Sequence, residues 1–252
     1  MPLSLDHLST IEADAARIRA AYDTKRDGRI PWSDRWTVRS VARHVAAAHH
    51  VAAGIIHARP TADFGLLDNL EQPPKNDPGF PAWFAAGTDA LCDALRSTDL
   101  DEPCWTSIPD GRTVRFWLRR ITHETLVHRW DAEVGAGLDP APFDAAVAAD
   151  GVDEYLVLAV PTLRKARRSP AGPPVHIACT DAEGSWYVQF DDDGGCSVSL
   201  SPVPVPVAAT LQGPAAGLLL ALYRRQSLDE LGVEFDGDPS ILERRDELLP
   251  CG

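Results

Sequence analysis

Apolar residues recur at helical spacing in five stretches of the first 160 residues of this 252-residue chain. Spacings of three and four residues place the apolar side chains of each stretch on one face, which a helix buries against its neighbours. The pattern therefore predicts an up-and-down helical bundle, a fold whose facing helices can pool metal ligands in the core. The expected helices cover residues 3–25, 38–57, 80–97, 113–135 and 143–160.

The pattern changes after a basic stretch at 164–168, which we interpret as a solvated loop. Short alternating runs follow, bounded by turns rich in aspartate and glycine, as is typical of antiparallel strands. The sequence therefore predicts a bundle over residues 1–162 and a smaller α+β domain over 174–252, with the boundary in 161–174. The elements expected in the second domain are strands at 175–179, 185–190, 197–200, 207–211 and 233–238, and helices at 215–223 and 239–249.

Charge and composition restrict the classes of partner. The formal net charge is -13, whereas nucleic acids and anionic membranes are bound by basic surfaces, so neither is expected as a partner. No apolar run reaches the length of a membrane span, and the N-terminus does not resemble a signal peptide. The five cysteines are scattered without a C-x-x-C pair, which favours reduced thiols in a cytoplasmic protein.

Glu124 and His128 stand four residues apart in the predicted helix at 113–135. This spacing places both side chains on one face, one turn apart, where they can clamp a divalent cation if a third ligand comes from elsewhere. His44 lies on the apolar stripe of the helix at 38–57 and is expected to point inward. It is the candidate third ligand.

Other polar and aromatic residues lie near these positions in the sequence. Asp131 lies three residues after His128. Its carboxylate can either accept a hydrogen bond from the second ring N–H of His128 or form a salt bridge. His123 is expected to point away from the ligand face, and His49 is the alternative third ligand. Trp36 and Trp130 are interpreted as packing residues rather than substrate platforms.

Two segments resemble a known family. The segment WTVRSVARH at 36–44 resembles the W-T-V-x-D-L-V-x-H pattern of the DinB-like superfamily, with Ser40 in place of the acid. The segment ETLVHRWD at 124–131 resembles the E-x-x-x-H-R-W-D pattern of the same group, and residues 209–238 resemble a sterol-carrier-like module. In this order they resemble the mycothiol-dependent maleylpyruvate isomerase family over nearly the whole chain.

The resemblance implies cofactors and site residues. It implies a divalent metal, usually zinc, held by His44, Glu124 and His128, and mycothiol as the thiol cosubstrate. It also implies an arginine from the C-terminal module that binds the substrate. Arg225 matches this position best, but Arg224 replaces the usual small residue before it, and the choice between the two stays open.

The activity implied is cis–trans isomerisation of an electrophilic small molecule resembling maleylpyruvate. The alternatives are a mycothiol S-transferase, in which the thiol stays on the product, and a non-catalytic DinB-like metal-binding or lipid-binding protein. Substrate choice is expected to depend on loops such as 58–79. The protein is expected to be a monomer or a homodimer.

Overall fold

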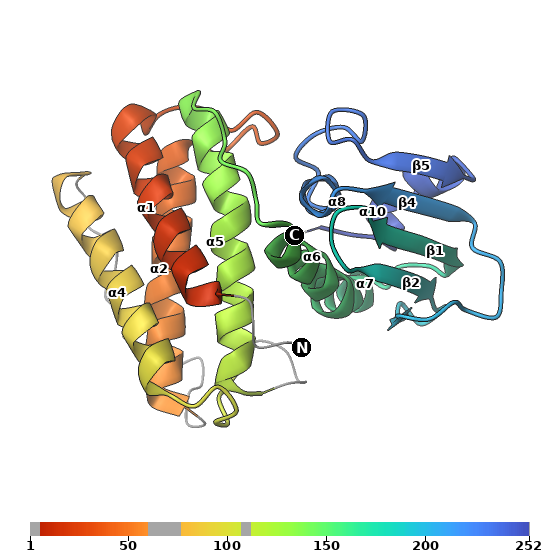
Figure 1. Ribbon diagram of the computed structural model, residues 1–252, viewed down its shortest axis with the longest axis horizontal. Coiled ribbons are helices and arrows are strands. Elements are labelled where there is room, and N and C mark those ends of the chain that lie inside the picture. Colours follow the sequence, from red (N-terminus) through yellow and green to blue (C-terminus); the bar gives the residue numbers. More distant parts are fainter. Residues whose placement is uncertain (1–5, 60–76, 107–111, 252) are drawn as a thin grey trace. The chain divides into compact units, whose positions relative to one another are not determined.

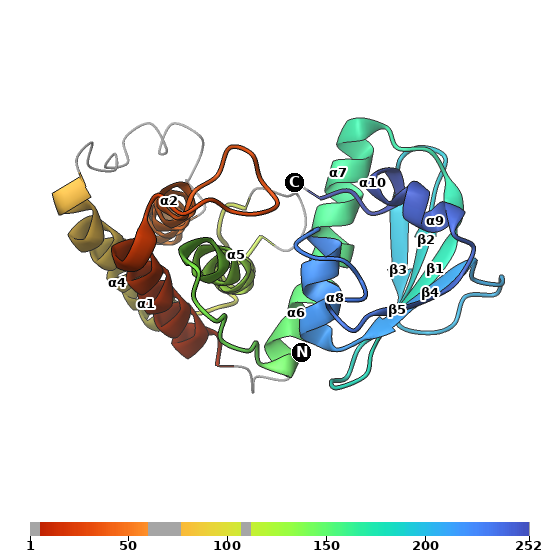
Figure 2. The ribbon, with the colours of Figure 1, turned by 90° about the horizontal axis from the view of Figure 1, so that it is seen from above.

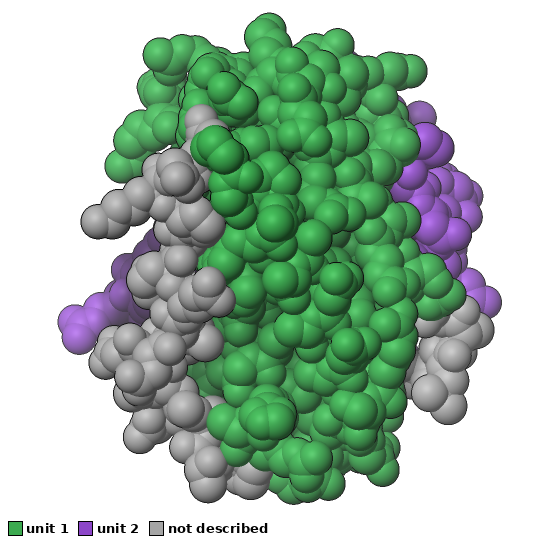
Figure 3. All heavy atoms as spheres, turned by 90° about the vertical axis from the view of Figure 1, so that its left-hand side faces the viewer, with its two compact units in different colours: residues 1–141 green, residues 142–252 purple. Residues whose placement is uncertain are grey.

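The computed structural model describes residues 6–59, 77–106 and 112–251. Most of the expected substrate-selecting loop at 58–79 lies outside these residues. The chain divides into two compact units, Met1–Ala141 and Pro142–Gly252, which Figure 3 colours separately. No described helix is long and apolar enough to cross a membrane.

The first unit is a bundle of long helices that lie side by side (Figure 1). Helix α1 packs on α5, and α2 packs on both α4 and α5. The helical bundle predicted from apolar spacing is thus confirmed. Its helices are α1 (His7–Lys25), α2 (Val38–Ala58), α4 (Phe80–Ser97) and α5 (Val114–Ala136), and the 3₁₀ turn η2 (Asp77–Gly79) precedes α4.

Local sequence determines where α2 begins and where α5 ends. Thr37 and Ser40 form a capping box in which each side chain bonds the backbone of the other, and this fixes the first turn of α2. Gly137 ends α5 in the left-handed conformation, with φ of 77°, which favours glycine. These signals place the two helices that carry the predicted ligands.

A buried polar contact joins three helices of the bundle. His49 of α2 is fully buried, and its Nδ1 and Nε2 lie 3.0 Å and 2.9 Å from the hydroxyls of Thr88 in α4 and Thr125 in α5. Both ring nitrogens thereby have partners inside an apolar core. This contact fixes the relative register of α2, α4 and α5.

An ion-pair network joins α1 to α5. The buried guanidinium of Arg129 donates to Asp14 of α1 at 3.1 Å and to Glu133 at 2.8 Å, and Arg17 also pairs with Glu133. Burial raises the pKa of Asp14 to about 6, although Arg129 acts in the opposite direction. Charges buried in this way hold helices together only while all partners are present.

The second unit is an α+β domain, as predicted. It begins with α6 (Ala145–Glu154), the π-helical turn η3 (Tyr155–Ala159) and α7 (Val160–Arg167). The remaining elements are β1 (Gly172–Cys179), β2 (Ser185–Phe190), β3 (Cys196–Ser199), β4 (Ala209–Gly213), α8 (Ala215–Leu222), β5 (Glu234–Gly237), α9 (Ser240–Glu243) and α10 (Arg245–Leu248). The single terminal helix expected at 239–249 is therefore two short helices.

The strands form one sheet in the order β3-β2-β1-β4-β5. Strands β1 and β4 are parallel, whereas the other neighbours are antiparallel, so the all-antiparallel expectation is wrong for this pair. Buried and less buried residues alternate along β1, β2 and β4. Alternation of this kind gives the sheet one face for the core, and α7 and α8 lie on the same side of it (Figure 2).

The division of the chain differs from the predicted boundary at 161–174. Helix α6 packs on α8, so it belongs to the second unit and not to the bundle. Tyr155 next to it donates its hydroxyl to the carbonyl oxygens of Leu249 and Pro250, at 2.8 Å and 3.1 Å. Apolar periodicity identified this helix correctly but does not reveal which neighbour covers its apolar face.

The basic stretch at 164–168 is also not a solvated loop. Residues up to Arg167 belong to α7, and Arg164 is fully buried. Its guanidinium donates to the carbonyl oxygens of Pro170 and Glu247 at 2.9 Å and 2.8 Å, and it lies over the ring of Phe190. This arginine therefore fastens the C-terminal segment to the sheet domain.

The buried His49 should make the bundle sensitive to acid. Burial, with His50 acting in the same direction, lowers its pKa to about 3 from 6.5. Below pH 6.5 the unfolded chain therefore gains a proton that the folded chain does not bind, so stability falls as the pH falls toward 3. We expect this residue to contribute up to about 1.4 kcal/mol per pH unit to that loss.

Denaturant unfolding of metal-free protein between pH 7 and pH 4 measures this contribution. His49→Gln should flatten the dependence of unfolding free energy on pH, whereas His57→Gln, at an exposed position of the same helix, should not. Parallel pH profiles for wild type and His49→Gln would contradict the assignment.

Candidate metal centre

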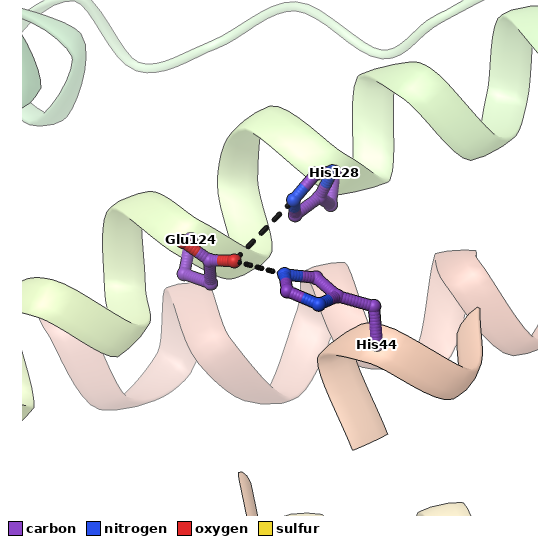
Figure 4. A group of neighbouring side chains, drawn as sticks. All are labelled: His44, Glu124 and His128. Atoms are coloured by element: carbon purple, nitrogen blue, oxygen red, sulfur yellow. Dashed lines mark hydrogen bonds and ion pairs between the residues drawn. The ribbon is translucent and has the colours of Figure 1, made fainter. Parts of the chain in front are cut away.

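Three predicted residues from two helices lie together in the bundle (Figure 4). Nε2 of His44, on α2, lies 2.6 Å from Oε1 of Glu124, and Nε2 of His128 lies 3.3 Å from the same oxygen. All three donor atoms are within 4.8 Å of one another. The structure therefore brings together the three residues that the sequence singled out.

The backbone explains this convergence. Glu124 and His128 are one turn apart on α5, as the spacing predicted, and point in the same direction (Figure 4). His44 reaches them because α2 packs against α5, with the contact between His49 and Thr125 joining the same two helices. The cluster thus depends on the packing of two helices, because His44 and Glu124 are 80 positions apart in sequence.

Electrostatics at the centre hold the carboxylate ionised and the histidine protonated. Burial alone would raise the pKa of Glu124, but its contacts with His128 and His44 lower it to well below its usual value. Burial would lower the pKa of His128, yet the contacts with Asp131 and Glu124 raise it to about 9. The same carboxylates that favour the charged form of His128 would also favour a bound cation.

Asp131 orients the second histidine. Its Oδ2 lies 2.8 Å from Nδ1 of His128, so this nitrogen is the N–H donor and Nε2 faces Glu124. A carboxylate that holds the far nitrogen of an imidazole is common behind metal-ligating histidines. Of the two roles that the sequence left open for Asp131, the contact to the histidine is the one observed.

Trp36 is more than a packing residue of the core. Its ring stacks on the imidazole of His128, with centroids 5.5 Å apart, and meets His44 edge-on at 5.2 Å. Trp130 instead packs against Trp32, with centroids 4.7 Å apart, as the packing interpretation predicted. Trp36 therefore forms one wall of the centre.

The remaining candidates lie elsewhere. His49 is occupied by its two threonines and is not in the cluster, so its role as alternative ligand is not supported. His123 is buried beside His7, consistent with the expectation that it points away from the ligand face.

The two arginines of the second unit differ in their contacts. Arg224 has a positive φ of 62°, and its guanidinium donates to the carbonyl oxygens of Leu222 and Leu249, both at 2.8 Å. Arg225 donates to the carbonyl oxygen of Tyr223 at 2.8 Å, and its guanidinium lies 5.8 Å from the centre of that residue's ring. Arg224 therefore holds the C-terminal segment in place through its hydrogen bond to Leu249.

The sequence reasoning missed Arg120. Its Nη2 donates to Oε2 of Glu124 at 2.8 Å, the oxygen that faces away from the two imidazoles. The available signal was the spacing of four residues before Glu124, which places both side chains on one helix face.

The donor set suits a divalent transition metal. Two imidazole nitrogens and one carboxylate oxygen are ligands typical of zinc and its neighbours in the first transition series. Three protein donors also leave coordination positions for exogenous ligands, as in catalytic rather than structural sites. The residues present therefore fit a metal ion of this class.

Comparison with known families agrees with this fold. Residues 8–133 match the family model described as the mycothiol maleylpyruvate isomerase N-terminal domain, and residues 146–244 match the C-terminal domain of the same family. The chain is a member of the mycothiol-dependent maleylpyruvate isomerase family. The two matches also separate near residue 141, where the structure divides into two units.

Solved structures share the fold at low sequence identity. A crystal structure of the mycothiol-dependent maleylpyruvate isomerase matches with a TM-score of 0.58 and 14% identity, covering 90% of this chain and 91% of the other. A mutant form matches with a TM-score of 0.60 and 14% identity, covering 94% and 95%. At such identity the likeness concerns the fold, and no curated protein sequence gives a match.

The contact with Asp131 can be tested by titration. In metal-free protein, His128 should lose its proton near pH 9, because the carboxylates beside it stabilise the imidazolium. Asp131→Asn removes one negative charge and should lower the pKa of His128 by about one unit or more. Heteronuclear NMR of the imidazole nitrogens measures it, with Asp139→Asn, outside the cluster, as control. An unchanged pKa in Asp131→Asn would contradict the assignment.

Proposed function

We propose that the protein is a metal-dependent enzyme that uses mycothiol to isomerise an electrophilic small molecule of the maleylpyruvate type. The observation that carries this proposal is the convergence of Nε2 of His44, Nε2 of His128 and Oε1 of Glu124. These three atoms would hold the divalent metal, for which zinc is the best fit to two imidazoles and one carboxylate. Membership of the family supports mycothiol as the thiol.

The bound cation would supply a lowered pKa for a thiol at the open position, so that the thiolate forms at neutral pH. Residues around the candidate metal centre orient its two histidines. Asp131 keeps Nδ1 of His128 protonated so that Nε2 can donate its lone pair. Trp36 stacks on the imidazole of His128 and meets that of His44 edge-on.

The reaction proposed needs no net consumption of thiol. The mycothiol thiolate adds to one carbon of the activated double bond, and the electron pair of that bond moves toward the conjugated carbonyl. Rotation about the resulting single bond and loss of the thiolate give the trans isomer. A leaving group on the substrate would instead give a thioether, which is the S-transferase alternative.

We also propose that Arg225 binds a carboxylate or the developing enolate of the substrate. This role rests on the family resemblance and on the commitment of Arg224 to backbone carbonyl groups. A guanidinium suits both partners because it donates two N–H groups in one plane.

Reaction of the metal-loaded protein with mycothiol and maleylpyruvate, followed by mass spectrometry, tests the function. We expect an isomerised product and free mycothiol, and loss of both metal and turnover in His44→Ala. His57→Ala, an exposed position on the same helix, should behave as wild type. A stable thioether would favour the S-transferase. A wild-type protein that takes up no divalent metal and does not bind mycothiol would refute the proposal.

Substitution of the two arginines should separate their roles. Arg225→Gln should lower kcat/KM by about 100-fold, since it removes a charged partner of the transition state, while metal content stays unchanged. Arg224→Gln should mainly lower the melting temperature, because it leaves the carbonyl oxygens of Leu222 and Leu249 without this donor. Equal kcat/KM for Arg225→Gln and wild type would contradict the role of Arg225.

A further inference from the structure

The carboxylate of Glu124 divides its two oxygens between different partners. Oε1 faces Nε2 of His44 and Nε2 of His128, whereas Oε2 accepts a hydrogen bond from Nη2 of Arg120 at 2.8 Å. A carboxylate without such a partner can offer both oxygens to a metal ion. The contact with Arg120 leaves one oxygen facing the two imidazoles.

The pair of Arg120 and Glu124 differs from an ordinary surface ion pair. Its side chains are 24% and 20% exposed, compared with 43% and 74% for Arg115 and Asp101, a pair that also involves α5. Less exposure means weaker screening by solvent and a more fixed geometry. In this pair the arginine precedes the glutamate along the helix. That order stabilises a helix less, because a glutamate placed before the cation suits the helix dipole better.

These observations point to a role in arranging the site rather than in stabilising α5. We propose that Arg120 is a positioning residue that holds Glu124 as a single-oxygen metal ligand. Three donor atoms then come from the protein, and the further coordination positions stay open to exogenous sulfur or oxygen ligands. The inference rests on the proposed metal centre and assigns it a residue of this chain that acts through Glu124.

The charge of Arg120 adds a second consequence. The guanidinium offsets the carboxylate of Glu124, so a centre containing a divalent ion, Glu124, Arg120 and Asp131 carries about one positive charge with neutral imidazoles. An anionic exogenous ligand is favoured at such a centre over a neutral one. Arg120 therefore favours the thiolate and carboxylate groups that the proposed chemistry requires.

Metal binding by variants tests the inference without relying on turnover. Arg120→Gln and Arg120→Ala should weaken zinc binding about 10-fold to 100-fold in competition with a chromophoric chelator, as is typical when the support of a ligand is removed. Arg120→Lys should recover part of the affinity, because it restores a charged donor. Arg115→Gln, at an arginine nearer the start of the same helix that pairs with Asp101 instead, is the matched control and should bind as wild type.

The visible spectrum of the cobalt(II)-substituted protein reports the coordination number. We expect weaker absorption in Arg120→Gln and Arg120→Ala than in wild type, since Glu124 is then free to supply its second oxygen. Circular dichroism of the metal-free variants checks folding, and alanine is the most favourable helix residue should glutamine not be tolerated.

Two outcomes separate this inference from the proposed function. If wild type binds zinc, and Arg120→Gln or Arg120→Ala shows the same affinity and cobalt spectrum as Arg115→Gln, the positioning role is overturned while the metal centre stands. If wild type binds no zinc or cobalt, both are overturned.

Discussion

The packing of α2 against α5 is the constraint on which the candidate centre depends. His44 comes from one helix and Glu124 from the other, so neither helix holds a complete ligand set. His49 fixes the pairing from inside the core through Thr88 and Thr125, with both ring nitrogens satisfied. This polar contact in an apolar interior fixes the positions of the helices along one another. A shift of one residue would leave buried polar groups without hydrogen-bond partners.

The candidate centre is built largely on one face of α5. Arg120, Glu124 and His128 follow one another at intervals of one turn, and Asp131 supports the last of them. The opposite side of the same helix is tied to α1 through Arg129. The helix thus has one face that carries the candidate centre and another that packs on α1, and its orientation about its own axis is held by charged contacts.

Local rules predicted most of the bundle and the three central residues. The spacing of four between Glu124 and His128 can be read directly. The apolar stripe of α2 placed His44 on the side of α5, but the expectation that it points inward is wrong, because 44% of its side chain is exposed. The contact with Arg120 was not foreseen, although it follows the same spacing rule. An i, i+4 ion pair is common on exposed helices, and sequence does not distinguish those that touch a site.

Longer-range features were predicted less well for physical reasons. The parallel pairing of β1 with β4 depends on a chain reversal through β2 and β3, which alternation of residue types does not encode. The burial of Arg164 depends on carbonyl groups from three separate segments. Similarly, the assignment of α6 depends on the position of α8, about seventy residues later in the chain.

The placement of α6 has a practical consequence for dividing the polypeptide. Val152, Leu156 and Val160 are fully buried in the folded chain. A fragment ending at residue 162 would retain these side chains without α8, and an uncovered apolar stripe of this kind promotes self-association. A fragment ending at Ala141 would keep α5 with its glycine cap and the acceptor for Arg129. The boundary between the two units therefore lies just before α6.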